Sequence, residues 1–267
     1  MELRYLRGLS ASLGITSVVD YDITGALPGT HLGMPSPNVT VVIDLRDGLD
    51  LSGPGLSDIT RFRVCLGGLH SAPYLIHHDG TQVGVQIGLS PTGVRRLFGL
   101  PVAELADRAI DLDELGPARA DELVGRIAAA PATDRARIGA ETMLSWASDP
   151  GVADGRWAPQ PDAAAAWGHI VATGGRCAVS ELTSRSGWST RYLTTRFVAE
   201  YGMGPKQAAR LVRFDCAFRA LRHGVAIDAV AAGCGYADQA HLTREFADFA
   251  SMSPARYLAR EEFPPAS

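Results

Sequence analysis

Hydrophobic and polar positions divide the chain into a strand-like N-terminal region and a helix-like remainder. Up to Leu89, β-branched and apolar runs are bounded by Gly and Pro, which is the pattern of short strands. These runs cover residues 38–45, 59–69 and 74–89. The last run is divided at Asp79-Gly80, a pair that favours a β-hairpin because both central turn positions need positive φ. This region therefore predicts a β-rich sandwich or barrel.

The pattern changes at Ser90. The stretches "SPTGVRRLFGL" and "PVAELADRAI" begin with helix-start signals, and apolar-periodic stretches follow at residues 118–129 and 133–148. The segment "SDPGVADGRWAPQP" is rich in Pro, Gly and Asp and has no periodicity, which indicates a linker. We therefore expect an α+β chain. It would consist of a β-rich domain with a helical tail at 1–147, a linker at 148–161 and an all-α domain at 162–262.

The helical region repeats a phrase, first as "GWSTRYLTTRFVAEYGMGP" and then as "GYADQAHLTREFADFASMSP". Each copy reads as a short helix, a sharp turn at Gly and a second helix, which is the helix-turn-helix arrangement. The spacings agree apart from one inserted residue, so accident is a poor explanation. The matched positions are Val179, Leu182, Gly187, Trp188, Leu193, Phe197 and Pro205 in the first unit, and Ile227, Val230, Gly235, Tyr236, Leu242, Phe246 and Pro254 in the second.

The second helix of each unit is expected to have one apolar stripe and one polar face. Leu193 and Phe197 stand at i and i+4, as do Leu242 and Phe246. Arg, Thr, Gln and His are frequent opposite these stripes, and they can hydrogen-bond base edges or touch a thymine methyl in the major groove. A solvated helix face has the same composition, and the repetition favours DNA. The residues opposite the stripes are Arg191, Thr194, Thr195 and Val198 in the first unit, and Gln239, Ala240, His241, Thr243 and Arg244 in the second.

Helix-end signals frame these units. Ser189 is placed to cap the first recognition helix, and Asp238 lies at the start of the second. Between the units, Pro205 suits a first helical turn and Gly224 a helix stop. A helix of about 18 residues there spans about 27 Å. It would hold the two recognition helices near the ~34 Å that separates successive major-groove segments on one side of B-DNA.

Charge supports this division. Of the overall net charge of −4, residues 1–166 carry −7 and residues 167–267 carry +3. A basic C-terminal region on an acidic body is the distribution expected when one module meets nucleic acid. The four cysteines are far apart and show no CxxC spacing, which favours a reducing compartment over a disulfide framework. Without a signal peptide or an apolar run long enough to span a membrane, a cytoplasmic location is expected.

The last 95 residues or so resemble the DNA-binding domain of the AraC/XylS family of bacterial transcriptional regulators. The stretch "VAAGCGYADQAHLTREFADFASMSPARYL" carries the Gly-aromatic turn, the Leu-x-x-x-Phe pair with a basic residue between them, and a terminal Ser-Pro-x-x-Tyr. The resemblance implies a bihelical reader of promoter DNA with its recognition helices in adjacent major grooves. With the cap Ser189 included, the DNA-binding positions fall on Ser189, Arg191, Thr194, Thr195, Gln239, Ala240, His241, Thr243 and Arg244.

The order of the domains also resembles full-length family members. There a cupin-like N-terminal domain takes a small-molecule effector, and helices such as those expected between residues 118 and 147 contribute to a homodimer. Double-stranded promoter DNA, a small-molecule effector, RNA polymerase for an activator and a second copy of the chain are the partners implied. This sequence departs from a strong reader at Ala240, which has no hydrogen-bonding side chain, and at the acidic Asp238, Glu245 and Asp248.

Other chemistry is weaker in the sequence. His31, His70, His77 and His78 lack the His-x-His spacing of metal-binding cupins, and no cofactor motif or catalytic triad is legible, so we expect no enzyme, no metal and no cofactor. Two alternatives stay open: a metal-binding cupin-like enzyme domain fused to a DNA-binding module, and a ligand-free regulator controlled by protein partners. Cys234 is either a small buried side chain or a redox-sensitive thiol. Arg95 and Arg96 form either a solvated pair or an anion site.

Overall fold

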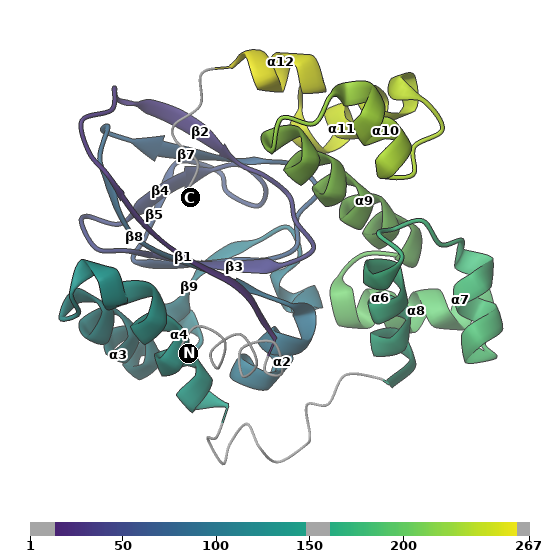
Figure 1. Cartoon of the computed structure of the whole chain (residues 1–267). Coiled ribbons are helices and arrows are strands. Elements are labelled where there is room, and N and C mark those ends of the chain that lie inside the picture. Colours follow the sequence, from purple (N-terminus) through teal and green to yellow (C-terminus); the bar gives the residue numbers. More distant parts are fainter. Residues whose placement is uncertain (1–13, 148–160, 261–267) are drawn as a thin grey trace.

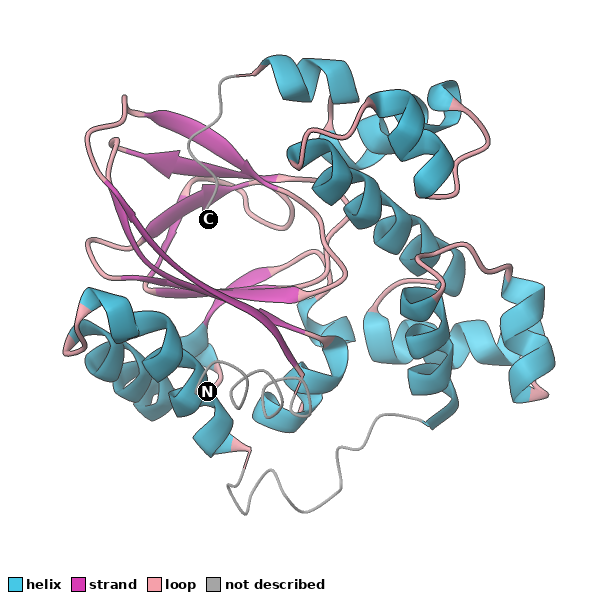
Figure 2. Ribbon diagram, viewed as in Figure 1, coloured by secondary structure: helices cyan, strands magenta, loops and turns pink. Residues whose placement is uncertain are grey.

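The computed structural model describes residues 14–147 and 161–260. They form a β-sandwich with flanking helices and then an all-helical region, which confirms the expected α+β class (Figure 1). Figure 2 shows the magenta strands gathered on one side and the cyan helices of the second region on the other. The expected linker at 148–161 lies almost entirely outside the described residues, as does the expected domain end at 262. No helix in the described ranges has the length and apolar character needed to cross a membrane.

Two antiparallel sheets face each other in the sandwich. The larger sheet has the order β1-β8-β3-β6-β9, and the smaller has the order β2-β7-β4-β5. Neighbours in each sheet are mostly distant in sequence, so the sandwich depends on long-range pairing. The strands are β1 (Ile15–Ile23), β2 (Gly29–Gly33), β3 (Val39–Asp44), β4 (Leu49–Ser52), β5 (Thr60–Phe62), β6 (Val64–Gly67), β7 (Tyr74–His78), β8 (Gln82–Leu89) and β9 (Ala109–Asp111).

Alternation along β3 gives its two faces different neighbours. Val39, Val41 and Ile43 are fully buried, while Thr40 and Val42 line the space between the sheets. The buried face of this sheet is covered by helices, and α4 approaches β8 closely at Gly139. The covering segments are the α-helices α2 (Pro91–Phe98), α3 (Pro117–Ala128) and α4 (Arg135–Trp146), with the 3₁₀ turns η1 (Val102–Leu105), η2 (Leu112–Glu114) and η3 (Ala132–Asp134).

The prediction of a β-hairpin at Asp79-Gly80 is wrong, because the two strands that flank this turn do not pair with each other. The turn itself is present, with Gly80 at φ 99°, but β7 pairs with β2 and β4 while β8 pairs with β1 and β3. The chain therefore passes from one sheet to the other at this turn. Gly80 packs so closely against the backbone of Ala26 that a Cβ there would lie 2.0 Å from its carbonyl oxygen. Glycine is required by this packing as well as by the positive φ.

Two other segments differ from the expected elements. The run at 59–69 is divided at Arg63, so that β5 joins the smaller sheet and β6 the larger. Arg63 bridges to the covering helices through an ion pair with Asp121 at 2.6 Å. The stretch "PVAELADRAI" forms the short turn η1 and the edge strand β9 instead of an α-helix. Pairing of β9 with β6 prevailed over the local helix signal there.

The second region of the chain is entirely helical in its described residues. It contains the two expected helix-turn-helix units, with α7 and α8 in the first and α10 and α11 in the second. The linking helix α9 has the expected 18 residues. The helices are α6 (Pro161–Ala172), α7 (Val179–Ser186), α8 (Thr190–Tyr201), α9 (Pro205–Arg222), α10 (Ile227–Gly233), α11 (Gln239–Ala250) and α12 (Pro254–Ala259).

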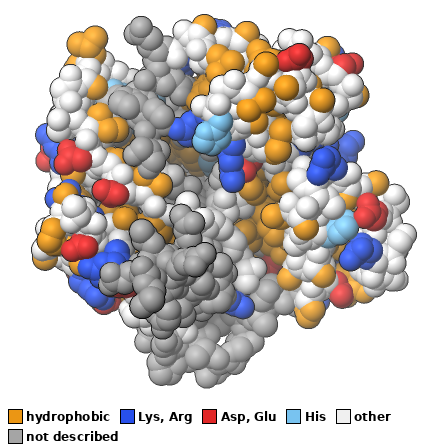
Figure 3. Space-filling view, viewed as in Figure 1, with side chains coloured by type: hydrophobic (Ala, Val, Ile, Leu, Met, Phe, Trp, Pro, Cys, Tyr) orange, Lys and Arg blue, Asp and Glu red, His pale blue; other side chains and the backbone are white. Residues whose placement is uncertain are grey.

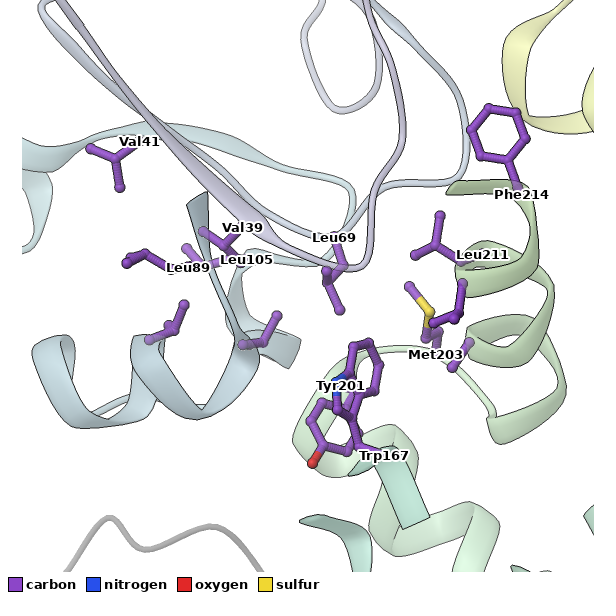
Figure 4. Packing of buried hydrophobic residues seen from close by; sticks show 14 of the residues in the cluster. Val39, Val41, Leu69, Leu89, Leu105, Trp167, Tyr201, Met203, Leu211 and Phe214 are labelled. Carbon is purple, nitrogen blue, oxygen red and sulfur yellow. The ribbon is translucent and has the colours of Figure 1, made fainter. Parts of the chain in front are cut away.

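One hydrophobic cluster runs through both regions of the chain. Figure 4 shows Leu69 of the sandwich side near Tyr201, Met203 and Leu211 of the helical side. The end of α8 comes close to η1, because a Cβ at Gly202 would lie 2.3 Å from the Cβ of Ala106. The sandwich and the first helix-turn-helix unit therefore share a core.

A buried ion pair crosses this shared core. Arg95 of α2 donates to both carboxylate oxygens of Glu200 in α8, with both distances 2.6 Å. The side chains are only 12% and 3% exposed, respectively. The expectation that Arg95 is a solvated or anion-binding residue is therefore wrong. Its guanidinium is bound by the carboxylate of Glu200, which lies 105 positions further along the chain.

Replacing Glu200 by Ala should lower the free energy of unfolding by about 3–5 kcal/mol, because Arg95 would remain buried without its counter-charge. Denaturant unfolding of the full chain measures this change. Asp50→Ala is the matched control, since Asp50 and Arg61 form a second bidentate pair at 2.6–2.7 Å in which Arg61 is 60% exposed. We expect the control to cost about 1 kcal/mol or less. Equal losses in the two variants would contradict the importance of burial.

Candidate nucleic-acid interface

Both helix-turn-helix units turn at a glycine in the left-handed region. Gly187 has φ 71° and Gly235 has φ 79°, so the two sharp turns expected from the sequence are present. The aromatic residue that follows each glycine packs on its own recognition helix. Trp188 lies edge-on to Tyr192 at a centroid distance of 4.4 Å, and Tyr236 lies edge-on to His241 at 5.3 Å. The two units therefore have the same local construction.

The first recognition helix, α8, is fixed by its inner face. Leu193 and Phe197 are fully buried, and Trp167 of α6 stacks on Tyr201 with a centroid distance of 4.5 Å. The helix begins at Ser189, whose hydroxyl accepts the N–H of Tyr192, as the sequence predicted. This cap satisfies one of the free N–H groups of the first turn.

The predicted DNA-binding residues of α8 lie largely on its open side. Arg191 and Thr195 are exposed, and Thr194 is half-buried. The hydroxyl of Thr195 donates to the carbonyl oxygen of Arg191, one turn earlier. Arg191 has no ion pair within the described residues. Ser189 is exposed, but its hydroxyl is engaged as the cap.

The second recognition helix, α11, has the same division. Leu242 and Phe246 are fully buried, and Asp238 caps the helix by accepting the N–H of His241 at 2.6 Å. The predicted DNA-binding residues vary in exposure. Gln239, Ala240 and Arg244 are exposed, and His241 and Thr243 are half-buried.

His241 is tied into the turn of its own unit. Its Nδ1 accepts the N–H of Ala237 at 3.3 Å, and its ring lies against Tyr236. Its Nε2 faces Glu245 at 3.8 Å. These contacts leave Arg244 as the long, exposed side chain of this helix without an ion pair among the residues that the structure describes.

The three acidic residues at and within α11 that the sequence analysis singled out are engaged with protein groups. Glu245 is buried and accepts hydrogen bonds from Arg210 and Arg213 of α9 at 2.8–3.0 Å. Asp248 pairs with Arg210, and Asp238 serves as the helix cap. Burial raises the pKa of Glu245, but the two arginines outweigh this effect and hold the pKa below its ordinary value of 4.5. Glu245 and Asp248 therefore hold α11 on α9, and Asp238 fixes the start of α11.

A cleft of about 880 Å³ separates the two units. Its walls come from the start of α7, from α9 and from α11. The lining cations Lys206, Arg210, Arg213 and Arg244 outnumber the lining carboxylates of Glu245 and Asp248, which gives the cleft an excess of positive charge. No side chain caps the first N–H groups of α7, which begins in this cleft at Val179. Sequence reasoning missed the cleft, although Lys206, Arg210 and Arg213 recur at helical spacing in the linking helix.

A second hollow lies between the two sheets, with a volume of about 360 Å³. Its walls are mainly apolar, and Phe218, Arg222 and Tyr257 of the helical region line it together with sandwich residues. Figure 3 shows Lys or Arg and His side chains together where the two regions of the chain meet. The cavity therefore touches the sandwich, the end of the linking helix α9, and α12.

The polar groups of this cavity are mostly uncharged at neutral pH. Burial, with smaller effects of His78 and Arg260, lowers the pKa of His31 to about 4. Burial raises the pKa of Tyr74, whose hydroxyl is enclosed and has no hydrogen-bond partner in the described stretches of the chain. Arg222 is the cation among the lining residues.

The four histidines weighed as metal ligands do not converge. His77 shares a hydrogen bond of 2.9 Å with Ser52, and His70 bonds the carbonyl oxygen of Ala72. His31 and His78 are ring neighbours at 5.5 Å. Within residues 14–147 and 161–260, no group of three or more His, Cys, Asp or Glu side chains is placed to hold a metal.

Comparisons with known proteins identify a helix-turn-helix domain in this chain and a solved structure with a similar fold. Residues 182–260 match the family model of a helix-turn-helix domain. ToxT from Vibrio cholerae O395 is 11% identical with a TM-score of 0.52, over 91% of this chain and 96% of that chain, so it shares the fold. A probable AraC family transcriptional regulator from Rhodopseudomonas palustris is 25% identical with a TM-score of 0.35, over 39% of this chain and all of that chain.

The DNA-binding domain of AdpA, solved with a target DNA, is 29% identical over 38% of this chain and 90% of that chain, with a TM-score of 0.33. A search of curated proteins finds no match.

Replacing Glu245 by Gln should lower the free energy of unfolding by roughly 1.5–3 kcal/mol at pH 7, because charged hydrogen bonds to two arginines are lost. The folded-state pKa of Glu245 lies below 4.5, so the carboxylate's contribution is complete above pH 4.5 and is lost as the pH falls further. The difference between wild type and variant should therefore shrink in acid. Unfolding measured between pH 3 and pH 7 follows it, at roughly one-unit intervals.

Asp248→Asn is the control, because Asp248 shares Arg210 but is 62% exposed. Its cost should be about 1 kcal/mol or less at neutral pH. A Glu245→Gln deficit that stays constant from neutral to acid pH would contradict the ion-pair explanation.

Proposed function

We propose that the chain, a DNA-binding transcriptional regulator whose residues 182–260 form an AraC-type helix-turn-helix domain, reads two adjacent major-groove segments of promoter DNA. The observation that carries this proposal is the duplication of one construction. Both α8 and α11 are capped at their starts, buried along one face and open along the other. A single chain then presents two readers joined by an 18-residue helix.

Base reading is assigned to the open faces. Arg191, Thr194 and Thr195 in α8, and Gln239, Thr243 and Arg244 in α11, supply side chains that recognise base edges. Ala240 can contact a thymine methyl. Ser189 and His241 support the helix starts through hydrogen bonds within their own units. Phosphate contacts fix the register of such a complex, while base contacts give its specificity.

The basic cleft between the units suits the sugar-phosphate backbone that connects two neighbouring groove segments. Lys206 and the uncapped N-terminus of α7 border it. Backbone N–H groups at a helix start favour an anion. Arg210 and Arg213 already neutralise Glu245, so their net contribution to phosphate binding is smaller than their number suggests.

Selection from a random double-stranded DNA pool with the full-length protein tests the function. We expect an enriched motif of two short blocks with centres about one helical turn, 10–10.5 base pairs, apart. Binding that is steeply salt-dependent and shows no enriched motif would refute sequence-specific reading by the isolated protein.

Arg244→Ala should weaken binding to the selected site by about 1–3 kcal/mol and relax preference at one base pair. Lys206→Ala is the matched control from the cleft. It should weaken binding to all sequences alike and reduce the slope of log K against log salt by about one unit. Fluorescence anisotropy on the selected site, on single-base variants and on random DNA separates the two effects. Equal weakening of specific and random DNA by Arg244→Ala would remove it from the base-reading set.

We further propose that the sandwich cavity takes a small apolar carboxylic acid as effector. ToxT is described in complex with an unsaturated fatty acid. Here the support is a mainly apolar cavity with a neutral His31, the cation Arg222 contributed by α9, and a Tyr74 hydroxyl that has no hydrogen-bond partner among the described residues. Because Phe218, Arg222 and Tyr257 belong to the helical region, occupancy can bias the position of the second unit.

An unsaturated fatty acid at 100 times its dissociation constant should stabilise the folded chain by about 2.7 kcal/mol. Thermal unfolding with increasing acid measures this. Arg222→Ala should weaken binding of the acid about tenfold, the effect of losing one charged hydrogen bond, and leave binding of the matching fatty alcohol unchanged. Equal weakening of acid and alcohol would contradict recognition of the carboxylate.

The remaining assignments complete the proposal. Residues 1–147 would be the effector and dimerisation domain, 148–161 the linker and 162–262 the reader. The α3–α4 pair would supply a homodimer contact, RNA polymerase would be the partner of an activator, and the cytoplasm of a bacterium would be the site of action. The alternatives are a metal-binding cupin-like enzyme domain fused to a DNA-binding module, and a ligand-free regulator controlled by protein partners.

A further inference from the structure

Two of the four cysteines meet where the linking helix α9 contacts the second helix-turn-helix unit. The Sγ atoms of Cys216 and Cys234 are 2.7 Å apart, and both residues are free thiols. Cys216 is exposed on the linking helix α9, while Cys234 is 5% exposed and ends α10. The other two cysteines, Cys65 and Cys177, lie in the sandwich core and before α7. No function described above uses this pair.

The pair lies at the turn of the second helix-turn-helix unit. Cys234 immediately precedes the turn glycine Gly235, and its N–H is held by the carbonyl oxygen of Val230 at 2.9 Å. The stem of Arg176 covers that turn, since a Cβ at Gly235 would lie 2.6 Å from its Cγ. A bond between the sulfurs would therefore join α9 to the residue that sets the entry of the recognition helix α11.

The two thiols differ in accessibility. Burial raises the pKa of Cys234, and the nearby positive charge of Arg176 partly opposes this effect. Cys234 is therefore mostly protonated at neutral pH. Cys216 faces solvent and is the thiol that a dissolved oxidant meets first.

We propose that Cys216 and Cys234 are a peroxide-sensitive dithiol whose oxidation forms a disulfide that cross-links α10 to α9. In the first step the Cys216 sulfur attacks one peroxide oxygen, the O–O bond breaks, and Cys216 becomes a sulfenic acid as water leaves. In the second step the Cys234 sulfur attacks the Cys216 sulfur, the S–OH bond breaks, and the Cys234 proton leaves with the hydroxyl as a second water. Two thiols and one hydrogen peroxide thus give one disulfide and two waters.

The proposed disulfide fits the distance already present between the two sulfurs. A disulfide needs about 2.05 Å between sulfurs, so the pair closes with a small movement. The cross-link constrains the unfolded chain between the two positions and so stabilises the native unit. It leaves the open face of α11 untouched, because neither cysteine belongs to that helix. Oxidation should therefore stabilise the second reader without blocking it.

The test begins with the reduced, full-length protein and hydrogen peroxide, followed by alkylation of remaining thiols and tryptic mass spectrometry. The expected product is a cross-link between the peptides 214–219 and 223–244, two hydrogens lighter than the pair, with Cys65 and Cys177 alkylated. Cys177→Ser is the matched control and should form the same cross-link. Cys216→Ser and Cys234→Ala should each abolish it. A cross-link to Cys177, a dimer joined through Cys216, or over-oxidation of Cys216 beside an alkylated Cys234 would overturn the proposal.

Thermal unfolding and DNA binding then test the consequence. Oxidised wild type should unfold several degrees higher than reduced wild type, and a thiol reductant should reverse the shift. Neither change should occur in Cys216→Ser. Affinity for the selected two-block site should be retained within about threefold after oxidation. Loss of that affinity, or a lower unfolding temperature, would contradict a disulfide that stabilises the second unit and leaves the open face of α11 accessible. The cross-link assay uses no DNA, so its result stands apart from the test of DNA reading.

Discussion

Burial of one face of each recognition helix is the constraint on which this protein depends. Leu193 and Phe197 in α8, and Leu242 and Phe246 in α11, have no exposed surface. An amphipathic helix that commits one side to a core fixes the direction of the other side. The open faces are therefore held by packing before any DNA is bound, and little conformational entropy has to be lost for two readers to act together.

The charged side chains of the helical region position its helices as much as they contribute to DNA binding. Glu245 draws Arg210 and Arg213 into a buried cluster, and Glu200 draws Arg95 across from the sandwich. Buried pairs of this kind add little net stability, but each fixes one geometry, because separating the partners leaves a charge in the core. The net positive charge of this region thus overstates what is free for phosphates.

The sandwich and the helical region are joined in two places with different character. The first unit shares a continuous hydrophobic core with the sandwich, where Tyr201 and Leu105 belong to one cluster. The end of α9 and α12, which flank the second unit, meet the sandwich at a cavity through Phe218, Arg222 and Tyr257. A close-packed core resists relative movement of the elements that form it, whereas a cavity can be filled or emptied. Under the proposed effector binding, this asymmetry would make the second unit the one whose position the effector influences.

Sequence alone determined the features that arise within one element. The apolar stripes, the caps at Ser189 and Asp238, the turn glycines and the 18-residue linking helix follow from helical periodicity and from unpaired N–H groups at helix starts. Only the tertiary structure decided which strands pair. It directed β7 and β8 into different sheets and brought together Arg95 with Glu200 and Cys216 with Cys234. These partners are 105 and 18 positions apart, and no local pattern encodes contacts that only long-range packing creates.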